Sequence, residues 1–180
     1  MSDTKKVSIE GLNNKYLMKK VLRKLPTEPE EKKNLNSNIN YTEEENLYFL
    51  SCLDDVDKFK ENDIQSYKLL SKNMSIKRSG YKVQDIKKKI FIEKEFISGE
   101  EILNLMKNCK LNCYYCNQTC LLFYKFVRDP KQWTLDRIDN SIGHNVSNVV
   151  ISCLKCNLKR RNKDKDKFFQ GSNFNLIKLN

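Results

Sequence analysis

The chain has 180 residues, 39% of them hydrophobic and 32% charged, which allows one modest core and an extension. Its formal net charge of +11 favours a polyanionic partner such as nucleic acid, although a lysine-rich soluble protein would show the same excess. The N-terminus lacks the apolar segment of a secretory signal and no apolar run reaches the length of a membrane span, so we expect an intracellular protein, in the cytoplasm or nucleus, with no membrane contact.

The first segment, residues 1–41, is polar and rich in Lys, Asn and Glu. Its stretch "LPTEPEEKKNLNSNIN" holds two of the chain's three prolines and almost no core-forming residues. Such a composition cannot bury enough apolar surface to offset the entropy of ordering. The sequence therefore predicts a flexible basic or polar arm.

Residues 42–108 read as a helical extension. Thr42 can cap a first helix with Glu45 as its capping-box partner, and the apolar residues that follow recur on one face. A second helix is predicted over "DIQSYKLLSKN", a third over residues 83–90 and a fourth after Ser98, with Glu101 in the capping-box position. The apolar face of the first helix comprises Tyr48, Phe49, Cys52, Leu53 and Val56.

The pattern changes over residues 109–170, and residues 171–180 read as a C-terminal tail. The segments "LLFYKFV", "WTLDRID" and "VVIS" predict strands, with a turn-rich loop, "NSIGHNVSN", between the last two. A helix is predicted over "CLKCNLKRRNKDKDKF". The fold class that follows is α+β, with the strands and their helix forming one domain after the helical extension.

Two C-x-x-C pairs frame this second half: Cys113 with Cys116, and Cys153 with Cys156. Four thiolates from two such turns form the tetrahedral, closed site that suits structural Zn²⁺. The alternative is a set of cysteines without metal. In a chain with seven cysteines and no secretory signal, metal binding is the more common use of paired cysteines. The remaining three, Cys52, Cys109 and Cys120, read as small core residues.

A second metal site is predicted between the two cysteine pairs. Asp136 lies near the end of a predicted strand, and Asn157 lies just inside the following helix. A strand hairpin packed across that helix brings the two side chains together. Their oxygens are the hard ligands that Mg²⁺ and Mn²⁺ prefer.

The stretch from Cys113 to Asn162 resembles the HNH endonucleases of the zinc-bound ββα-metal type. Within it, the segment "KQWTLDRIDN…GHN…NVVISCLKCNLKRRN" is similar to HNH-like proteins of large DNA viruses. The resemblance covers roughly the last 70 residues of the chain. It implies a ββα-metal fold in which Asp136 and Asn157 hold the catalytic metal. It also implies that Asn148 pins the loop between the two strands and thereby orients the catalytic strand.

Arg137 departs from that family, which has its general-base histidine at this position. Arginine stays protonated and cannot easily accept the proton of the attacking water. Three interpretations remain open. In the first, Arg137 clamps the phosphate while a metal activates water, and Asp139 takes the proton or helps to bind the metal. In the second, His144, the only histidine in the sequence, is a displaced base. In the third, the site is degenerate and only binds nucleic acid.

The basic residues of the last predicted helix are candidates for phosphate contacts, although a charge run is often only a solvated face. Our first hypothesis is a metal-dependent endonuclease acting on DNA, with RNA left open. Its rivals are a nuclease-derived module that binds nucleic acid without cleavage, and an adaptor for other proteins; a homodimer is compatible with each. The candidate phosphate ligands are Lys155, Lys159, Arg160 and Arg161.

Overall fold

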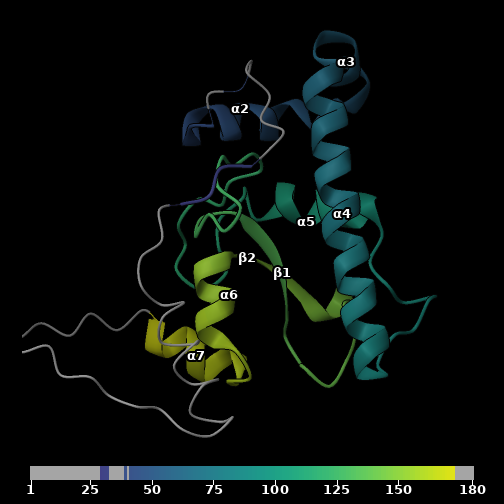
Figure 1. Cartoon of the computed structure of the whole chain (residues 1–180), viewed down its shortest axis with the longest axis vertical. Coiled ribbons are helices and arrows are strands. Elements are labelled where there is room, and N and C mark those ends of the chain that lie inside the picture. Colours follow the sequence, from purple (N-terminus) through teal and green to yellow (C-terminus); the bar gives the residue numbers. More distant parts are fainter. Residues whose placement is uncertain (1–28, 33–38, 40, 173–180) are drawn as a thin grey trace, which may run out of the picture.

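The computed structural model describes residues 29–32, 39 and 41–172. The described part combines helices with one small sheet and is therefore α+β. Figure 1 shows α2 and α3 at one end of the molecule, with the long helix α4 running along its length. The elements in chain order are α2 (Glu43–Cys52), α3 (Val56–Asn62), α4 (Ile64–Lys88), α5 (Gly99–Asn108), β1 (Trp133–Arg137), a 3-10 turn (Val146–Asn148), β2 (Val149–Cys153), α6 (Leu154–Arg160) and α7 (Lys165–Ser172).

The predicted arm is packed where it is described. The backbone N–H of Lys32 donates to the carbonyl of Lys125 at 2.9 Å, and that of Val127 donates to the carbonyl of Glu30 at 2.9 Å. Ile39 is buried in the core. These residues therefore contact a distant loop, a pairing that local composition does not reveal. The rest of the predicted arm, residues 1–28, 33–38 and 40, lies outside the described part.

Helix α2 begins as predicted: the hydroxyl of Thr42 accepts a hydrogen bond from the backbone N–H of Glu45 at 3.2 Å. Phe49 and Leu53 from its predicted apolar face are buried, whereas Tyr48 is exposed. At the start of α5, Ser98 and Glu101 form the complete capping box that the sequence predicts.

Helix α4 replaces the second and third predicted helices. It runs unbroken for 25 residues, through Gly80, and its C-cap Lys89 adopts a left-handed conformation with φ 58°. Val83 and Ile86, within the third predicted helix, are exposed. The reason is that α4 packs through the opposite face, on which Leu70, Met74 and Asp85 are buried. Within the described residues, even this helix is too polar to cross a bilayer, and no other helix is long enough.

The sheet consists of β1 and β2, which pair antiparallel with Leu135 opposite Ile151. Both strands were predicted. The segment "LLFYKFV" is not a strand: its residues 121–124 are buried in irregular structure, with isolated bridges in place of a ladder. The outer edge of β1 is covered by α4, since the backbone N–H of Leu135 donates to the hydroxyl of Tyr81 at 3.0 Å.

The last predicted helix is divided in two. Helix α6 ends at Arg160 because Arg161 takes a positive φ of 54°, and α7 starts four residues later at Lys165. The order strand, strand, helix is the one predicted, and α6 packs across the β1–β2 pair. The last eight residues, 173–180, lie outside the described part.

Candidate metal centre and nucleic-acid interface

The four predicted cysteines converge. Their sulfur atoms, from Cys113, Cys116, Cys153 and Cys156, all lie within 4.8 Å of one another. Sulfurs on a tetrahedral zinc lie about 3.8 Å apart, given Zn–S bonds of about 2.3 Å. The set can therefore hold a metal ion such as zinc with small adjustments.

Local structure positions each cysteine pair. The first turn closes through the N–H of Asn117, which donates to the carbonyl of Cys113 at 2.9 Å. The N–H of Tyr114 then donates to the carbonyl of Ile151 at 2.9 Å, which fixes this turn against β2. In the second pair, the N–H of Cys156 donates to the sulfur of Cys153 at 3.4 Å.

The cysteine thiols shift one another's pKa values. Hydrogen bonds from the thiols of Cys120 and Cys153 lower the pKa of Cys113, whereas burial raises the pKa of Cys156 to about 12. Cys120 is fully buried, as predicted for a core residue, but it also hydrogen-bonds a predicted ligand. A bound dication would favour the thiolate form of all four ligands.

Asp136 lies on β1, facing α6, and both of its carboxylate oxygens have partners. The hydroxyl of Tyr115 donates to Oδ2 at 2.8 Å, and Nη1 of Arg160 donates to Oδ1 at 2.9 Å. Burial raises the pKa of Asp136, while the hydrogen bond from Tyr115 and the charge of Arg160 act in the opposite direction. The carboxylate thus already has a cationic partner from its own chain.

Arg160 is only 1% exposed, so the prediction that it contacts phosphates is wrong for this structure. Its guanidinium also donates to the carbonyls of Arg137 and Ile138, at 2.6 and 2.8 Å. It ties α6 to the end of β1. In contrast, Lys155, Lys159 and Arg161 are exposed, as the phosphate-contact prediction requires.

Hydrogen bonds within the chain engage both side chains that were predicted to bind Mg²⁺ or Mn²⁺. Asn157 does face β1, but its side-chain amide donates to the hydroxyl of Thr134 at 3.1 Å and to the carbonyl of Leu135 at 3.2 Å. The Asp136 carboxylate is occupied by a guanidinium. A divalent cation added here would meet a buried positive charge, which is unfavourable at low local dielectric.

Asn148 lies at the closure of the loop between the strands. Its amide nitrogen donates to the carbonyls of Asp139 and Gly143, at 2.9 and 3.0 Å, and its oxygen accepts from the N–H of Asp139 at 2.9 Å. Asp139 itself is exposed, and its carboxylate accepts from the N–H and hydroxyl of Ser141. The geometry gives Asn148 a loop-closing role and gives Asp139 a turn-forming role.

His144 is buried, at 3% exposed, and lies in a network that sequence reasoning missed. Its Nδ1 is 2.8 Å from Oδ1 of Asp85, and its backbone N–H donates to Oδ2 of the same carboxylate at 2.7 Å. The ring also stacks on Tyr81, with centroids 4.5 Å apart. Burial lowers the pKa of His144, against the opposing effect of Asp85.

Arg137 completes this network from the end of β1. Its Nη1 is 3.6 Å from Oδ1 of Asp85, and the side chain is buried. It faces away from Asp136, because successive side chains of a strand point to opposite faces. The available signal for Asp85 was weak: a lone Asp on a helix otherwise bearing Lys residues, 59 residues from its partner His144.

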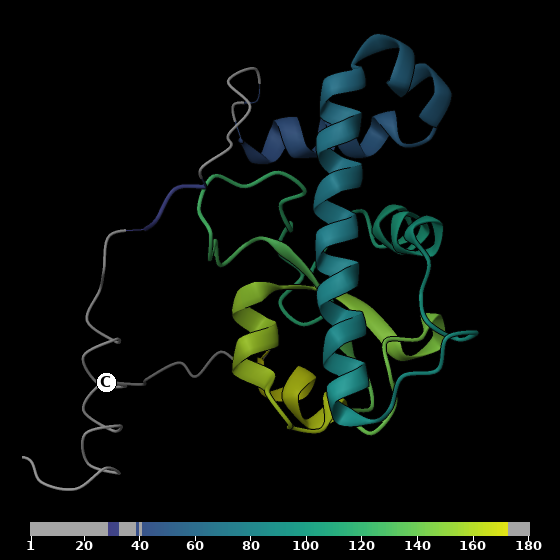
Figure 2. The same ribbon diagram turned by 45° about the vertical axis from the view of Figure 1, so that its right-hand side comes forward.

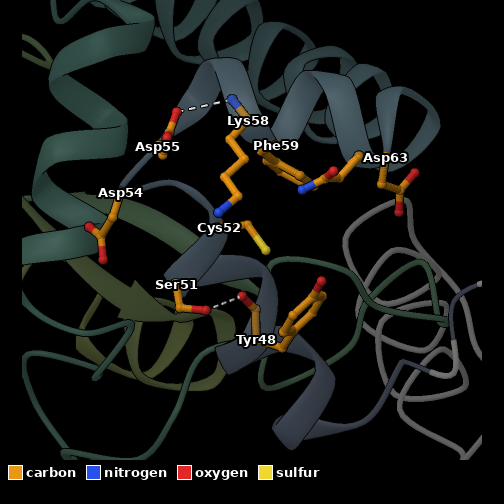
Figure 3. Close-up of a pocket in the computed structure, with 9 residues that line it drawn as sticks. Tyr48, Ser51, Cys52, Asp54, Asp55, Lys58, Phe59 and Asp63 are labelled. Atoms are coloured by element: carbon orange, nitrogen blue, oxygen red, sulfur yellow. Dashed lines mark hydrogen bonds between the residues drawn. The ribbon is translucent and has the colours of Figure 1, made fainter.

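A cavity of about 300 Å³ lies between α2 and α3 (Figure 3), at the end of the molecule opposite α7 (Figure 1). Three aspartates line it, and each has a structural role. Asp55 and Asp63 cap α3 and α4, and Asp54 pairs with Lys107 at 3.3 Å. The acidic lining of the cavity is therefore explained by the fold.

No family model, no curated protein and no solved structure matches this chain.

Proposed function

We propose that this chain is a nucleic-acid-binding module of the HNH type, stabilised by zinc, that does not cleave through a metal at Asp136. The observation that carries the proposal is the buried Arg160 guanidinium, 2.9 Å from the carboxylate to which the resemblance assigns a divalent cation. One buried carboxylate can neutralise the guanidinium alone far better than the guanidinium and a divalent cation together. The zinc would be held by the four cysteines and would serve the fold.

Charge supports the binding part of the proposal. The chain carries +11, and Lys155, Lys159 and Arg161 are exposed on or next to α6. Within the described part of the chain, none of these three forms an ion pair with a carboxylate. Cations without a partner can neutralise phosphates and release counterions. DNA is the expected polyanion, since the resemblance is to DNA endonucleases.

The metal-dependent endonuclease remains a second candidate, because two observations favour it. Asn148 closes the loop as the resemblance implies, and Asp85 holds His144 through Nδ1, the orientation of a general base. Among the described residues, no hydrogen bond to Nε2 of His144 is formed. This candidate requires Arg160 to leave Asp136 before a metal can bind.

One experiment separates the two candidates: incubation of supercoiled plasmid with the zinc-loaded chain in Mg²⁺ or in Mn²⁺, alongside gel-shift titrations. We expect retarded plasmid that stays supercoiled, with an affinity that falls steeply as salt rises. Nicking that needs the metal and disappears in Asp136→Asn and His144→Asn would instead establish the endonuclease.

A matched pair of triple variants controls the binding measurement. Changing Lys155, Lys159 and Arg161 to Gln should weaken binding and reduce the salt slope by about 0.9 for each phosphate that is no longer neutralised. Changing three exposed lysines at the other end of the molecule removes the same charge and should leave the slope nearly unchanged. These are Lys58, Lys68 and Lys72. Absence of any shift at low salt would overturn the proposal.

A further inference from the structure

We infer that the C-terminal end of α4 is a second phosphate-binding element, and that a nucleic-acid duplex lies across the β1–β2 loop between this end and α6. The inference rests on the proposed function and goes beyond it, because it assigns a ligand-binding role to the helical extension. The element consists of Lys87, Lys88 and Lys89, all exposed. We call these three residues the α4 lysines.

The fold brings the α4 lysines to the β1–β2 loop. Asp85, two residues before them, accepts from the backbone N–H of His144 at 2.7 Å. Gly143 lies so close to the end of α4 that a Cβ built on it would be 2.8 Å from the carbonyl oxygen of Ile90. Lys88 is near enough to His144 for its charge to lower the pKa of that imidazole. The end of α4 and the loop therefore form one continuous structure.

The other side of the same loop reaches α6. The side-chain amide of Asn140 donates to the carbonyl of Arg161 at 3.4 Å. In both views the end of α4, the loop and the end of α6 lie at the same end of the molecule, opposite α2 and α3 (Figure 1 and Figure 2). Two groups of cations thus flank the loop.

The α4 lysines have no carboxylate partners within residues 29–32, 39 and 41–172. Lysines in the last turn of a helix also interact favourably with the helix dipole, and this alternative role would stabilise α4 modestly. That role would appear in thermal stability alone. A phosphate-binding role appears in the salt dependence of binding, so the two can be measured separately.

One acidic group on the loop opposes a polyanion. Asp139 is exposed, and its carboxylate is held by the N–H and hydroxyl of Ser141. A duplex crossing the loop would pass this negative charge. Replacement of Asp139 by Asn keeps an acceptor for the turn and removes the charge. It should therefore strengthen binding if the duplex takes this path, and should have no effect if the duplex binds elsewhere.

The side chains of the surface favour a duplex over a single strand. Single strands are held by bases stacked on exposed aromatic rings. Residues 82–89, 138–145 and 158–164 contain one aromatic ring, that of His144, and it is buried. Exposed cations that contact only phosphates suit the denser backbone charge of a duplex, and they read no sequence.

The test is a salt titration of binding to a fluorescent DNA duplex and to the single strand of the same length, using the zinc-loaded chain. Four proteins are compared: wild type, K87Q/K88Q/K89Q, the control K58Q/K68Q/K72Q, and Asp139→Asn. We expect the α4 variant to lower the salt slope by about 2 to 3, at about 0.9 for each lysine that contacts a phosphate. The control should keep the wild-type slope, and Asp139→Asn should bind more tightly. Each protein should bind the duplex better than the single strand.

Failure of the inference differs from failure of the proposed function. If wild type binds, and only K155Q/K159Q/R161Q reduces the slope, α6 is the whole binding surface and the inference is wrong. If wild type does not bind either DNA, both are wrong. A fall in melting temperature of the α4 variant with an unchanged slope would assign these lysines to the helix dipole and overturn the inference.

Discussion

Two buried carboxylates, Asp136 and Asp85, lie on opposite sides of β1 and are neutralised in different ways. Asp136 pairs with Arg160 and Tyr115, from segments that the cysteine pairs hold together. Asp85 belongs to α4 and accepts from the backbone and ring of His144, with Arg137 at 3.6 Å. The first region is organised around the cysteine cluster, and the second depends on long-range packing of a helix against a loop.

The difference has a consequence for function. A permanent cation beside Asp136 makes that carboxylate structural, which argues against a metal there. The partner of Asp85 is an imidazole, and within the described residues only its Nδ1 forms a side-chain hydrogen bond.

Removal of the zinc proposed for the four cysteines should have the largest effect on stability. It should unfold the region around Asp136, which the cysteine pairs hold together. Zinc binding contributes about 10 kcal/mol or more in small zinc modules, which is comparable with the total stability of a domain. We expect Cys153→Ser, or a strong chelator, to abolish the cooperative unfolding of the wild type. Metal analysis and circular dichroism check this, with Cys52→Ser as the control outside the cluster. Full zinc content and an unchanged melt in Cys153→Ser would contradict it.

Loss of the Arg160 guanidinium should have the next largest effect on stability. Arg160→Met leaves the buried Asp136 carboxylate without its ion pair, at an expected cost of about 3–5 kcal/mol. Denaturant unfolding measures it. The double variant Asp136→Asn with Arg160→Met removes both charges and should recover much of the loss. Equal stability of the single variant and wild type would show that the guanidinium is not needed in the interior.

Gly143→Ala probes the contact between the loop and α4. The added Cβ would lie 2.8 Å from the carbonyl oxygen of Ile90 and 3.1 Å from Oδ2 of Asp85. Backbone must therefore move, at a cost of about 1–3 kcal/mol. Gly80→Ala is the matched control. No atom lies within 4 Å of its Cβ position, so in mid-helix it should stabilise by about 0.5–1 kcal/mol. Opposite signs for the two variants are the expected result.

The smallest effect is a pH dependence in the Asp85 region. The pKa of His144 is lowered in the folded state by burial, so protonation favours the unfolded chain. Its contribution to stability is complete above the unfolded pKa of about 6.5 and declines as the pH falls below that value. The difference in unfolding free energy between wild type and His144→Asn should therefore shrink in acid. A difference independent of pH from 7.5 to about 5 would show that His144 does not titrate in this way.

Several elements could be predicted from the sequence because their signals are local. Two C-x-x-C pairs predicted the convergence of four sulfurs, and the segments "WTLDRID" and "VVIS" predicted β1 and β2. The caps at Thr42 and Ser98 fixed two helix starts through hydrogen bonds three residues apart. Asp136 lies near the end of β1, as predicted, but its pairing with Arg160 was not predicted.

The errors share one cause. Nothing near Arg160 in the chain indicates that its guanidinium turns inward, since its carboxylate partner is 24 residues away. Likewise, "LLFYKFV" has strand propensity but finds no neighbouring strand to complete a ladder. The union of two predicted helices into α4 depends on Gly80 costing only about 1 kcal/mol within a long packed helix.

The sequence by itself determined the elements whose hydrogen bonds and ligands lie within a few residues: the capped helices, the two strands and the cysteine turns. Only the tertiary structure decided which buried charge meets which partner, because Coulomb energy and desolvation depend on distance in space. That decision placed Arg160 on Asp136 and His144 on Asp85, and it left the α4 lysines facing solvent beside the loop.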